Sequence, residues 1–366
     1  MKIIIDIRML NDNLHGIARY TYALIKTMDR SKVQYYYLSN KEKNKITIKR
    51  NDYIIMKSNF LSITEQWELP LVLNKYKNEA IFHSPSFVSS PFIKCPTIMT
   101  IHDLNHLKFP EYYTRFHRYY YNYIVKPSAL KAKKILTVSE FSKKEIVNWL
   151  NCESEKVVVT YNGIDENFKV INDNDKLRNI RTKYDLPEKF ILYIGNLKPH
   201  KNIANLIKAI KKINQKIILV INGKSNESLN KIIMENHVEN KIKFIGYVND
   251  DDLPALYNLA ELFIYPSLYE GFGLPPLEAM ACGCPVITSN TSSLPEVVGD
   301  AGIMVNPYNV EEIARAIDLV LSNENLRREM IEKGLKQAQK FSWRKTAEET
   351  LKVYEEVYKE AFGGKS

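Results

Sequence analysis

The sequence predicts an α/β protein built from two Rossmann-like domains that face a central cleft. Short runs of β-branched residues alternate with longer amphipathic stretches, which is typical of parallel sheets covered by helices. This alternation weakens once, near the middle of the chain, and then resumes with the same pattern. The 366 residues are enough for two domains, each with a sizeable buried core.

The first half of the chain contains the first series of expected strands and helices. The strands are short and rich in Val, Ile and aromatic residues, a composition that suits a buried, pleated surface. Apolar residues recur at helical spacing over residues 17–28, 116–132 and 140–150, which predicts three helices. Either Ser139 or Ser142 would cap the third of these helices. The expected strands cover residues 3–7, 33–38, 53–56, 80–83, 97–101, 135–138 and 157–160.

A polar segment separates the two halves. Residues 162–188 are rich in Asp and Asn and are bounded by Gly163 and Pro187, which is typical of a linker with room for one short helix. Residues 342–361, near the C-terminus, have the pattern of a long amphipathic helix. Strands of the second half are expected at residues 190–194, 217–221, 242–245, 262–265, 286–288 and 303–305.

These elements define the expected domains. A first Rossmann-like domain is expected over residues 1–170, a linker over 171–187 and a second Rossmann-like domain over 188–341. The C-terminal helix, over 342–366, either packs on its own domain or crosses back to the first. Helical periodicity does not distinguish these two arrangements.

Composition excludes several classes of protein. Apolar residues make up 45% and charged residues 26% of the chain, as in an ordinary globular protein. No run approaches the roughly 18 apolar residues of a membrane span, and the apolar start stops at Asp6, so neither a span nor a secretory signal is expected. We therefore expect a cytosolic protein. Its four cysteines, without recognisable metal-ligand spacing, are expected to be reduced thiols.

The net charge of +10 favours an anionic partner, which would be nucleic acid, a phosphorylated substrate or an anionic membrane surface. Residues 115–134 combine six Lys and Arg residues with four tyrosines and Phe116. This stretch is either an amphipathic helix packed by its tyrosines or a surface that meets lipid headgroups. A second basic stretch, residues 41–50, is expected to be a solvated hairpin or loop. No motif supports nucleic-acid binding.

The most informative segment is YPSLYEGFGLPPLE, residues 265–278. A strand is expected to end at its start, and ligands of open parallel sheets bind at such carboxyl ends. Glycines let the backbone approach a ligand, and Pro275 and Pro276 suit the first turn of a helix. Glu270 and Glu278 could then face one pocket and bind pairs of sugar hydroxyls. The alternative is a helix cap next to a surface acid.

Two further patterns are interpreted as structural. Ser293 and Glu296 have the spacing of a capping box at a helix start. The acidic residues 250–252 precede an expected helix over 253–260, whose N-terminus acidic side chains stabilise. We therefore assign no metal to the acidic run.

Taken together, these motifs resemble the retaining glycosyltransferases of family 4, which have the GT-B architecture of two Rossmann-like domains around a cleft. EGFGLPPLE has their E-x7-E pattern, and the GIARYT and KPHKN variants resemble the branch with bacterial mannosyltransferases of surface polysaccharide synthesis. The resemblance covers nearly the whole chain. Its segments are residues 6–21, 100–104, 135–146 and 161–165 in the first half and residues 193–202, 244–248, 292–302 and 341–343 in the second.

In the second domain, the resemblance implies the site of a nucleotide-sugar donor. Glu278 would hold the ribose hydroxyls, and Glu270 would face the donor sugar as a catalytic residue. Lys201 would neutralise the diphosphate, and Val248 would contact the base through the backbone. The backbone that binds sugar hydroxyls and phosphate would be that of Gly271, Phe272, Gly273 and Leu274.

In the first domain, the resemblance implies that Gly16 lets a loop approach the β-phosphate and that His102, a second catalytic candidate, lies beside the donor sugar. One position departs from the family pattern. Asn196 stands in the substrate-binding loop where many members have arginine, so one phosphate cation is missing. His200 or Arg19 would substitute for it.

The resemblance implies a retaining, metal-independent hexosyltransferase that moves a sugar from a nucleoside-diphosphate sugar to a glycan or lipid-linked acceptor, in surface polysaccharide or glycoconjugate synthesis. The first domain would take the acceptor and the second the donor, with GDP-mannose favoured as co-substrate and no further cofactor. A glycosyltransferase of this kind would also contact the inner face of an anionic membrane. The alternatives are a nucleotide-sugar epimerase or phosphorylase on the same fold, and a non-catalytic sugar-binding relative.

Overall fold

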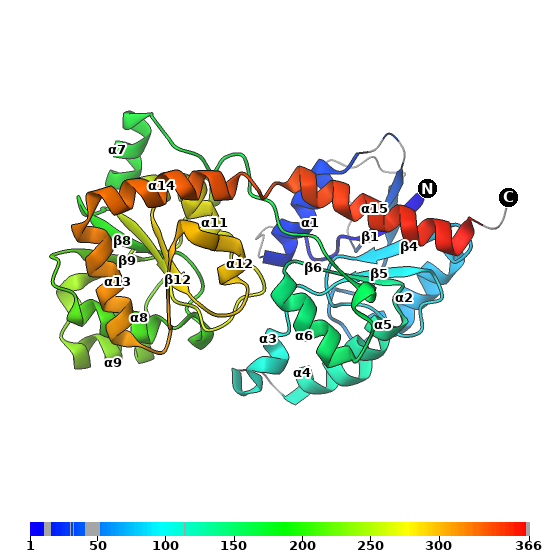
Figure 1. The fold of residues 1–366 in the computed structure, drawn as a ribbon. Helices are drawn as coiled ribbons and strands as arrows, with labels where there is room; N and C mark the ends of the chain where they lie inside the picture. The colour runs from blue at the N-terminus through cyan, green and yellow to red at the C-terminus, as the bar shows by residue number, and fades with distance from the viewer. Residues whose placement is uncertain (11–15, 30, 32, 41–51, 113–114, 364–366) are drawn as a thin grey trace. The chain divides into compact units, whose positions relative to one another are not determined.

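The structure, a computed structural model, describes all residues except 11–15, 30, 32, 41–51, 113–114 and 364–366. The expected hairpin or loop at residues 41–50 thus lies outside the described residues. The chain divides into two compact units (Figure 1). Unit 1 comprises Met1–Gly163 together with Trp343–Ser366, and unit 2 comprises Ile164–Ser342. The first stretch of unit 1 thus ends at Gly163 rather than at residue 170, and the C-terminal helix belongs to unit 1.

Unit 1 contains a seven-stranded sheet in the order β3-β2-β1-β4-β5-β6-β7, and all neighbouring strands are parallel. Each strand falls on one of the expected β-branched runs. The direction of chain progression reverses between β1 and β4, which is where open α/β sheets bind ligands. The strands are β1 Lys2–Asp6, β2 Gln34–Ser39, β3 Tyr53–Ile55, β4 Ala80–Ser84, β5 Thr97–Thr100, β6 Lys134–Thr137 and β7 Val157–Val159.

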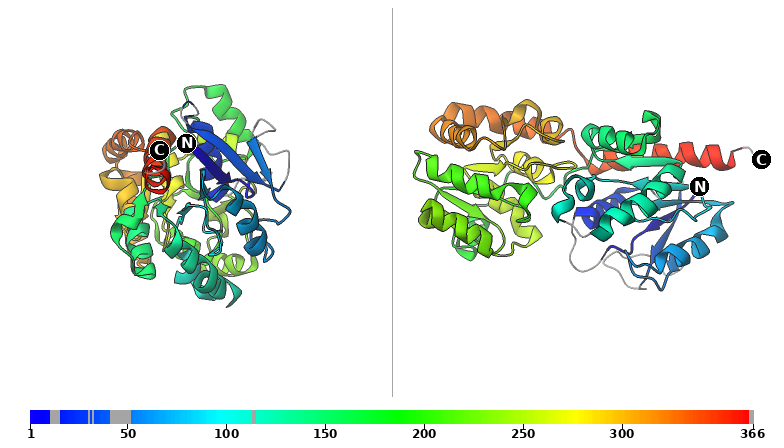
Figure 2. Two further views of the ribbon diagram at one scale, coloured as in Figure 1. Left: turned by 90° about the vertical axis from the view of Figure 1, so that its right-hand side faces the viewer. Right: turned by 90° about the horizontal axis from the view of Figure 1, so that it is seen from below.

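Helices cover both faces of this sheet (Figures 1 and 2). On one face α15 packs on α1, and its Tyr354 hydroxyl lies 2.5 Å from Nδ1 of His83 in β4. On the other face Leu69 of α2 packs against Phe82, the neighbour of His83 in the strand. The helices are α1 Gly16–Thr27, α2 Glu65–Leu73, α3 Asn105–Lys108, α4 Arg115–Tyr120, α5 Lys126–Lys131, α6 Glu140–Leu150 and α15 Trp343–Phe362.

Two proline positions explain where these helices depart from expectation. Helix α2 was not expected, because Pro70 lies inside it and removes a helical N–H donor. The carbonyl of Gln66, which loses that donor, accepts a hydrogen bond from Ser90 Oγ at 3.2 Å instead. The expected helix 116–132 is interrupted by a π turn at Tyr121–Val125, directly before the Pro127 that would clash with a regular turn.

Unit 2 contains a six-stranded parallel sheet in the order β10-β9-β8-β11-β12-β13, which reverses between β8 and β11. All six strands were expected. The strands are β8 Phe190–Tyr193, β9 Ile218–Ile221, β10 Ile242–Phe244, β11 Leu262–Tyr265, β12 Val286–Ser289 and β13 Ile303–Val305.

The helices of unit 2 form two packed groups (Figures 1 and 2). Helix α8 packs with α9 and α13, whereas α11 packs with α10, α12 and α14. Helix α7, which lies in the expected linker 171–187, packs on α10. The helices are α7 Asn174–Lys183, α8 Ile203–Lys212, α9 Glu227–Asn236, α10 Leu253–Leu259, α11 Leu274–Ala281, α12 Leu294–Val298, α13 Val310–Ser322 and α14 Glu324–Ala338.

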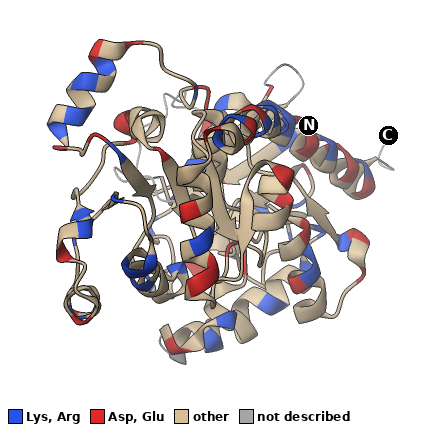
Figure 3. Ribbon diagram, turned by 60° about the vertical axis from the view of Figure 1, so that its left-hand side comes forward, with Lys and Arg blue, Asp and Glu red and all other residues tan. Residues whose placement is uncertain are grey.

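Within the described part of the chain, no helix has the length and apolar content needed to cross a membrane. Lys and Arg are interspersed with Asp and Glu along the described helices of both units (Figure 3). The net charge of +10 is therefore spread over many elements.

Candidate active site

The candidate donor site lies in unit 2, where the sheet order reverses between β8 and β11. The loops that follow these two strands both leave the carboxyl edge at this point, so they lie next to each other. Residues 194–201 follow β8, and residues 266–273 follow β11. The two loops are joined by a backbone hydrogen bond from Leu268 N to the carbonyl of His200, at 2.8 Å.

Lys201 and Glu270 form an ion pair between these loops. Lys201 Nζ lies 2.6 Å from Glu270 Oε1, and their side chains are only 9% and 12% exposed. The same ammonium donates a hydrogen bond to the Tyr265 hydroxyl at 3.1 Å and lies 5.4 Å from the centre of its ring. The family resemblance implies separate roles for these two charged residues, whereas the structure places them in direct contact.

Asn202 fixes the turn that carries Lys201. Its φ of 62° is a left-handed conformation that ends the 3₁₀ turn Pro199–Lys201, and α8 begins at the next residue. Asparagine tolerates this conformation better than most residues. The side-chain amide donates to the carbonyls of Pro266 and Pro307 at 3.0 and 2.7 Å. The lysine is therefore held by a buried polar anchor.

Serine hydroxyls that follow β12 hold the Glu270 loop. Ser293 Oγ lies at donor distance from the carbonyls of Glu270 and Phe272, at 2.9 and 2.6 Å, and Ser292 Oγ accepts from the Glu270 N–H at 3.1 Å. Ser293 is the N-cap residue of α12 but makes no side-chain hydrogen bond to that helix, so the serine part of the expected capping box is absent. The Phe272 ring is buried and packs edge-on against Phe341, with 5.7 Å between the ring centroids.

Helix α11 begins directly after this loop. Gly273 has a φ of +117°, and a Cβ there would lie 2.7 Å from Leu294, so the position requires glycine. Leu274 is the first helical residue, which places Glu278 in the second turn of the helix. Glu278 is 5% exposed, and its Oε2 accepts a hydrogen bond from the Tyr257 hydroxyl at 2.9 Å.

Glu270 and Glu278 both act on Tyr265. Burial raises the pKa of this phenol well above its usual value of 10, and the charge of each carboxylate raises it further. Glu270 contacts the ammonium that donates to the Tyr265 hydroxyl, whereas Glu278 accepts from Tyr257. Gly271, between them in sequence, is buried in the loop.

His200, one of the two residues expected to substitute for the missing phosphate cation, is buried in the loop after β8. Burial, reinforced by the positive charge of Lys201, lowers the pKa of its imidazole to about 4, so the ring is neutral at pH 7. Asn196, at the position of the missing arginine, is exposed, and its Oδ1 accepts from the Lys198 N–H at 3.2 Å. Lys201 is therefore the cation that this loop carries into the cluster with Glu270.

Val248 lies in the segment after β10 and is 5% exposed. Gly223 and Gly246 exchange two backbone hydrogen bonds, of 2.6 and 3.1 Å, which join this segment to the end of β9. Tyr247, next to Val248, is 76% exposed and was not singled out in the sequence. The signal that could have found it is an aromatic residue directly after a strand-end glycine.

His102 and Gly16 lie in unit 1. His102 follows β5, and its Nε2 lies 3.0 Å from the carbonyl of Pro85, which can only accept a hydrogen bond. Burial lowers the pKa of this imidazole to about 4, so the neutral ring presents Nδ1 as an acceptor. Gly16 is the first residue of α1 and is exposed, with open space where a Cβ would lie.

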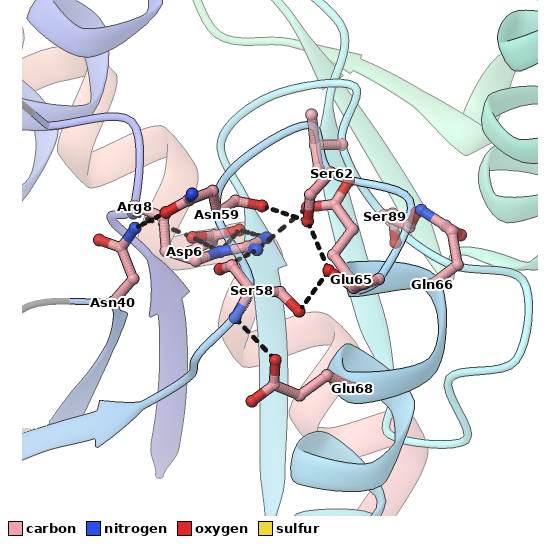
Figure 4. A network of polar contacts seen from close by, with 12 residues as sticks. Asp6, Arg8, Asn40, Ser58, Asn59, Ser62, Glu65, Gln66, Glu68 and Ser89 are labelled. Atoms are coloured by element: carbon pink, nitrogen blue, oxygen red, sulfur yellow. Dashed lines mark hydrogen bonds and ion pairs between the residues drawn. The ribbon is translucent and has the colours of Figure 1, made fainter.

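Unit 1 also contains a buried ion network that the sequence did not reveal (Figure 4). The Arg8 guanidinium lies 2.7 Å from Asp6 and 3.0 Å from Glu65, and all three side chains are 0% exposed. Burial raises the pKa of Glu65 to about 7, although Arg8 opposes the shift. Arg8 Nη1 also lies 3.5 Å from the Ser58 carbonyl, so the network ties the end of β1 to the start of α2.

Two parallel sheets covered by helices are the architecture expected from the sequence for a GT-B glycosyltransferase. Two family descriptions match the chain: Glycosyltransferase Family 4 over residues 14–168 and Glycosyl transferases group 1 over residues 173–337. The chain is 36% identical over 290 residues to O-antigen chain mannosyltransferase B of Escherichia coli, covering 77% of this chain and 75% of that protein. The chain belongs to glycosyltransferase family 4, and it is an enzyme of that class.

Other relatives give the same family. The chain is 30% identical over 259 residues to O-antigen chain mannosyltransferase RfbU of Salmonella typhimurium, covering 69% of this chain and 67% of that protein. It is 37% identical over 281 residues to the serotype-specific mannosyltransferase WbdA of Escherichia coli. That match covers 72% of this chain but spans only about a third, 34%, of WbdA.

Solved structures confirm the fold. Sucrose-phosphate synthase from Thermosynechococcus elongatus superposes with a TM-score of 0.77 at 19% identity, covering 98% of this chain and 99% of that one. HepE of Anabaena in complex with UDP-glucose gives a TM-score of 0.76 at 18% identity, covering 97% and 100%. The expected α/β architecture of two Rossmann-like domains is therefore correct.

Proposed function

We propose that this glycosyltransferase moves mannose from GDP-mannose to a glycan or lipid-linked acceptor of surface polysaccharide synthesis. The observation that carries the donor site is the contact of Lys201 with Glu270 where the second sheet reverses. The mannose assignment is supported by relatives that are described as O-antigen and serotype-specific mannosyltransferases. The donor class is supported by a structural relative solved with UDP-glucose.

Each residue of the cluster takes part in binding or in stabilising charge. Lys201 neutralises the diphosphate as the bond to the sugar breaks, together with N–H groups of the loop from Gly271 to Leu274. Glu270 exchanges its contact with Lys201 for a sugar hydroxyl when the donor enters. Glu278 accepts hydrogen bonds from the ribose hydroxyls, and the exposed ring of Tyr247 covers one face of the base.

Nucleotide sugars added one at a time to the full chain test the donor. A ligand that binds the folded state raises the thermal midpoint by mass action, so GDP-mannose should give the largest shift. A larger shift with a UDP-sugar would contradict the mannose donor.

Release of GDP that depends on added acceptor would separate a transferase from an epimerase or phosphorylase. The configuration of the new linkage, read by NMR, and activity in excess chelator test retention and metal independence.

We further propose that α4 and the π turn after it face an anionic membrane that carries the acceptor. The structure divides the tyrosines of this stretch: Tyr121 is 1% exposed in the core, whereas Tyr119 and Tyr123 stack 6.2 Å apart and are 61% and 69% exposed. Arg118, beside them, is exposed. Exposed tyrosine rings and a cation suit the headgroup region of an anionic bilayer.

Flotation with anionic liposomes tests this contact. The double variant Tyr119→Ser and Tyr123→Ser should lose at least tenfold in partitioning at low salt. Tyr308→Ser, at a 68% exposed tyrosine of unit 2, is the matched control and should float like the wild type. Failure of the wild type to float would remove the membrane from the proposal and leave the transferase in place.

A further inference from the structure

A cavity of about 170 Å³ opens in unit 1 at the amino ends of β5 and β6. It lies between residues 89–97, which lead into β5, and residues 128–133, which end α5 and lead into β6. His102 follows the other end of β5, so the cavity lies at the sheet edge opposite to the one at which ligands of this fold bind. Nothing in the proposed donor or acceptor chemistry uses it.

The described lining of this cavity is basic. Lys94, Lys131 and Lys133 contribute to its wall, and none of the lining residues is acidic. The Lys94 ammonium has no hydrogen-bond or ion-pair partner among the described residues. Lys131 Nζ donates one hydrogen bond, to the carbonyl of Pro91 at 2.8 Å, which leaves two of its three N–H donors for a ligand. Lys133 is already paired with Glu360, at 2.5 Å.

A serine adds to the polar wall. Ser89 lines the cavity, and the residue is 1% exposed. A hydroxyl can donate one hydrogen bond, so an anion inside the cavity would accept from Ser89 and from the two lysines. The volume of about 170 Å³ is several times that of a water molecule, which is room for one small charged group.

Apolar side chains flank the same segments on the outside. Phe92, in the loop that forms one wall, is 64% exposed, and Leu130, next to Lys131 in the other wall, is 44% exposed. Large apolar side chains held in water beside a basic cavity suit a ligand that is both anionic and apolar. We propose that the cavity binds the phosphoryl group of an anionic phospholipid, whose acyl chains lie against Phe92 and Leu130.

This site is separate from the donor cluster and from Tyr119 and Tyr123, so its failure would leave both earlier proposals standing. Calorimetry on the full chain at constant ionic strength measures it with two probes. Inorganic phosphate tests the anion site alone, and dihexanoyl phosphatidylglycerol, kept below its micelle concentration, tests the lipid. The short-chain lipid should bind with one-to-one stoichiometry and more tightly than phosphate does.

Two variants test the basic part and the apolar part of the site separately. Changing Lys94 and Lys131 together to Gln should weaken both probes at least tenfold, since each basic contact contributes about fivefold in affinity. Phe92→Ser should weaken only the lipid and leave phosphate binding unchanged. The matched control changes Lys144 and Lys352 to Gln; both are exposed in unit 1 and outside the cavity, so this variant should bind like the wild type. Thermal unfolding checks that every variant is folded.

The outcomes are decisive. If the wild type binds neither probe, or if the Lys94 and Lys131 variant binds as the wild type does, the anion site is wrong. If phosphate and lipid bind equally tightly, the cavity is a site for free phosphate and the lipid assignment is overturned.

Discussion

Ion clusters at the carboxyl ends of parallel strands occur in both units, but water reaches them to different degrees. In unit 2, the side chains of Lys201 and Glu270 are 9% and 12% exposed to solvent. In unit 1, the side chains of Asp6, Arg8 and Glu65 are 0% exposed. A partly exposed ion pair can exchange partners with a ligand, whereas a closed one can only hold chain segments together. The comparison predicts that the cluster in unit 2 binds a ligand and that the cluster in unit 1 is structural, although both consist of a basic residue paired with carboxylates.

The largest effect is expected from breaking the closed cluster. Arg8→Met leaves Asp6 and Glu65 buried without a cation, which typically costs about 3–5 kcal/mol of unfolding free energy. Urea unfolding followed by tryptophan fluorescence measures this loss in unit 1, because Trp67, Trp149 and Trp343 all lie there. GDP affinity of the folded variant should stay that of the wild type. A loss of stability below 1 kcal/mol would show that the network is not structural.

The next effect is expected from breaking the open cluster. Lys201→Met should lower kcat about 10²–10³-fold, the usual loss when one group that stabilises transition-state charge is removed. Its unfolding free energy should fall less than that of Arg8→Met, since water still reaches Glu270. Lys208→Met, at an exposed lysine of α8, is the control and should keep full activity. Equal turnover in the two variants would remove Lys201 from the mechanism.

The pH dependence of stability sharpens the comparison further. The pKa of Glu65 is raised from 4.5 to about 7 in the folded chain, because burial disfavours its charge. The folded chain therefore keeps a proton that the unfolded chain loses, so this stabilisation is complete below pH 4.5 and is lost as the pH rises through 7. The unfolding free energy of the wild type relative to Glu65→Gln should fall by about 3 kcal/mol across this interval. A constant difference would mean that Glu65 does not titrate there.

The smallest effect is expected at the carboxylate that accepts from a tyrosine. Glu278→Ala should weaken GDP binding about ten- to a hundredfold, since losing a hydrogen bond to a charged group costs about 1.5–3 kcal/mol. Tyr257→Phe removes only the 2.9 Å hydrogen bond that supports this carboxylate and should weaken binding less than tenfold. Calorimetry measures both. Unchanged affinity in Glu278→Ala would contradict its contact with ribose.

Elements with a strong local pattern were predictable. Every described strand falls on an expected β-branched run, because buried parallel strands carry continuous apolar sequence. Helix α2 was missed, since Pro70 removes a local donor that only Ser90, distant in sequence, replaces. Of the two serines expected to cap α6, Ser139 is the cap, because its Oγ accepts from the Ser142 N–H at 3.0 Å.

Which residues belong to the candidate site followed from the motifs, but what each one touches did not. Glu270 and Glu278 stand out because glycine, proline and acid occur together at a strand end. Ser293 has the spacing of a helix cap and yet serves the backbone of the neighbouring loop. Spacing along the chain specifies local partners, whereas hydroxyl groups bond to whichever carbonyl the fold brings near.

The α/β class, the order of the strands along the chain and the loop with the two carboxylates could all be predicted from local sequence patterns. The order of the strands within each sheet, the return of α15 to unit 1 and the contact between Lys201 and Glu270 became visible only in the folded chain. The physical reason is the range of the forces involved. Propensity and hydrophobic periodicity act over a few neighbouring residues, whereas the pairing of a buried charge depends on which strands lie side by side.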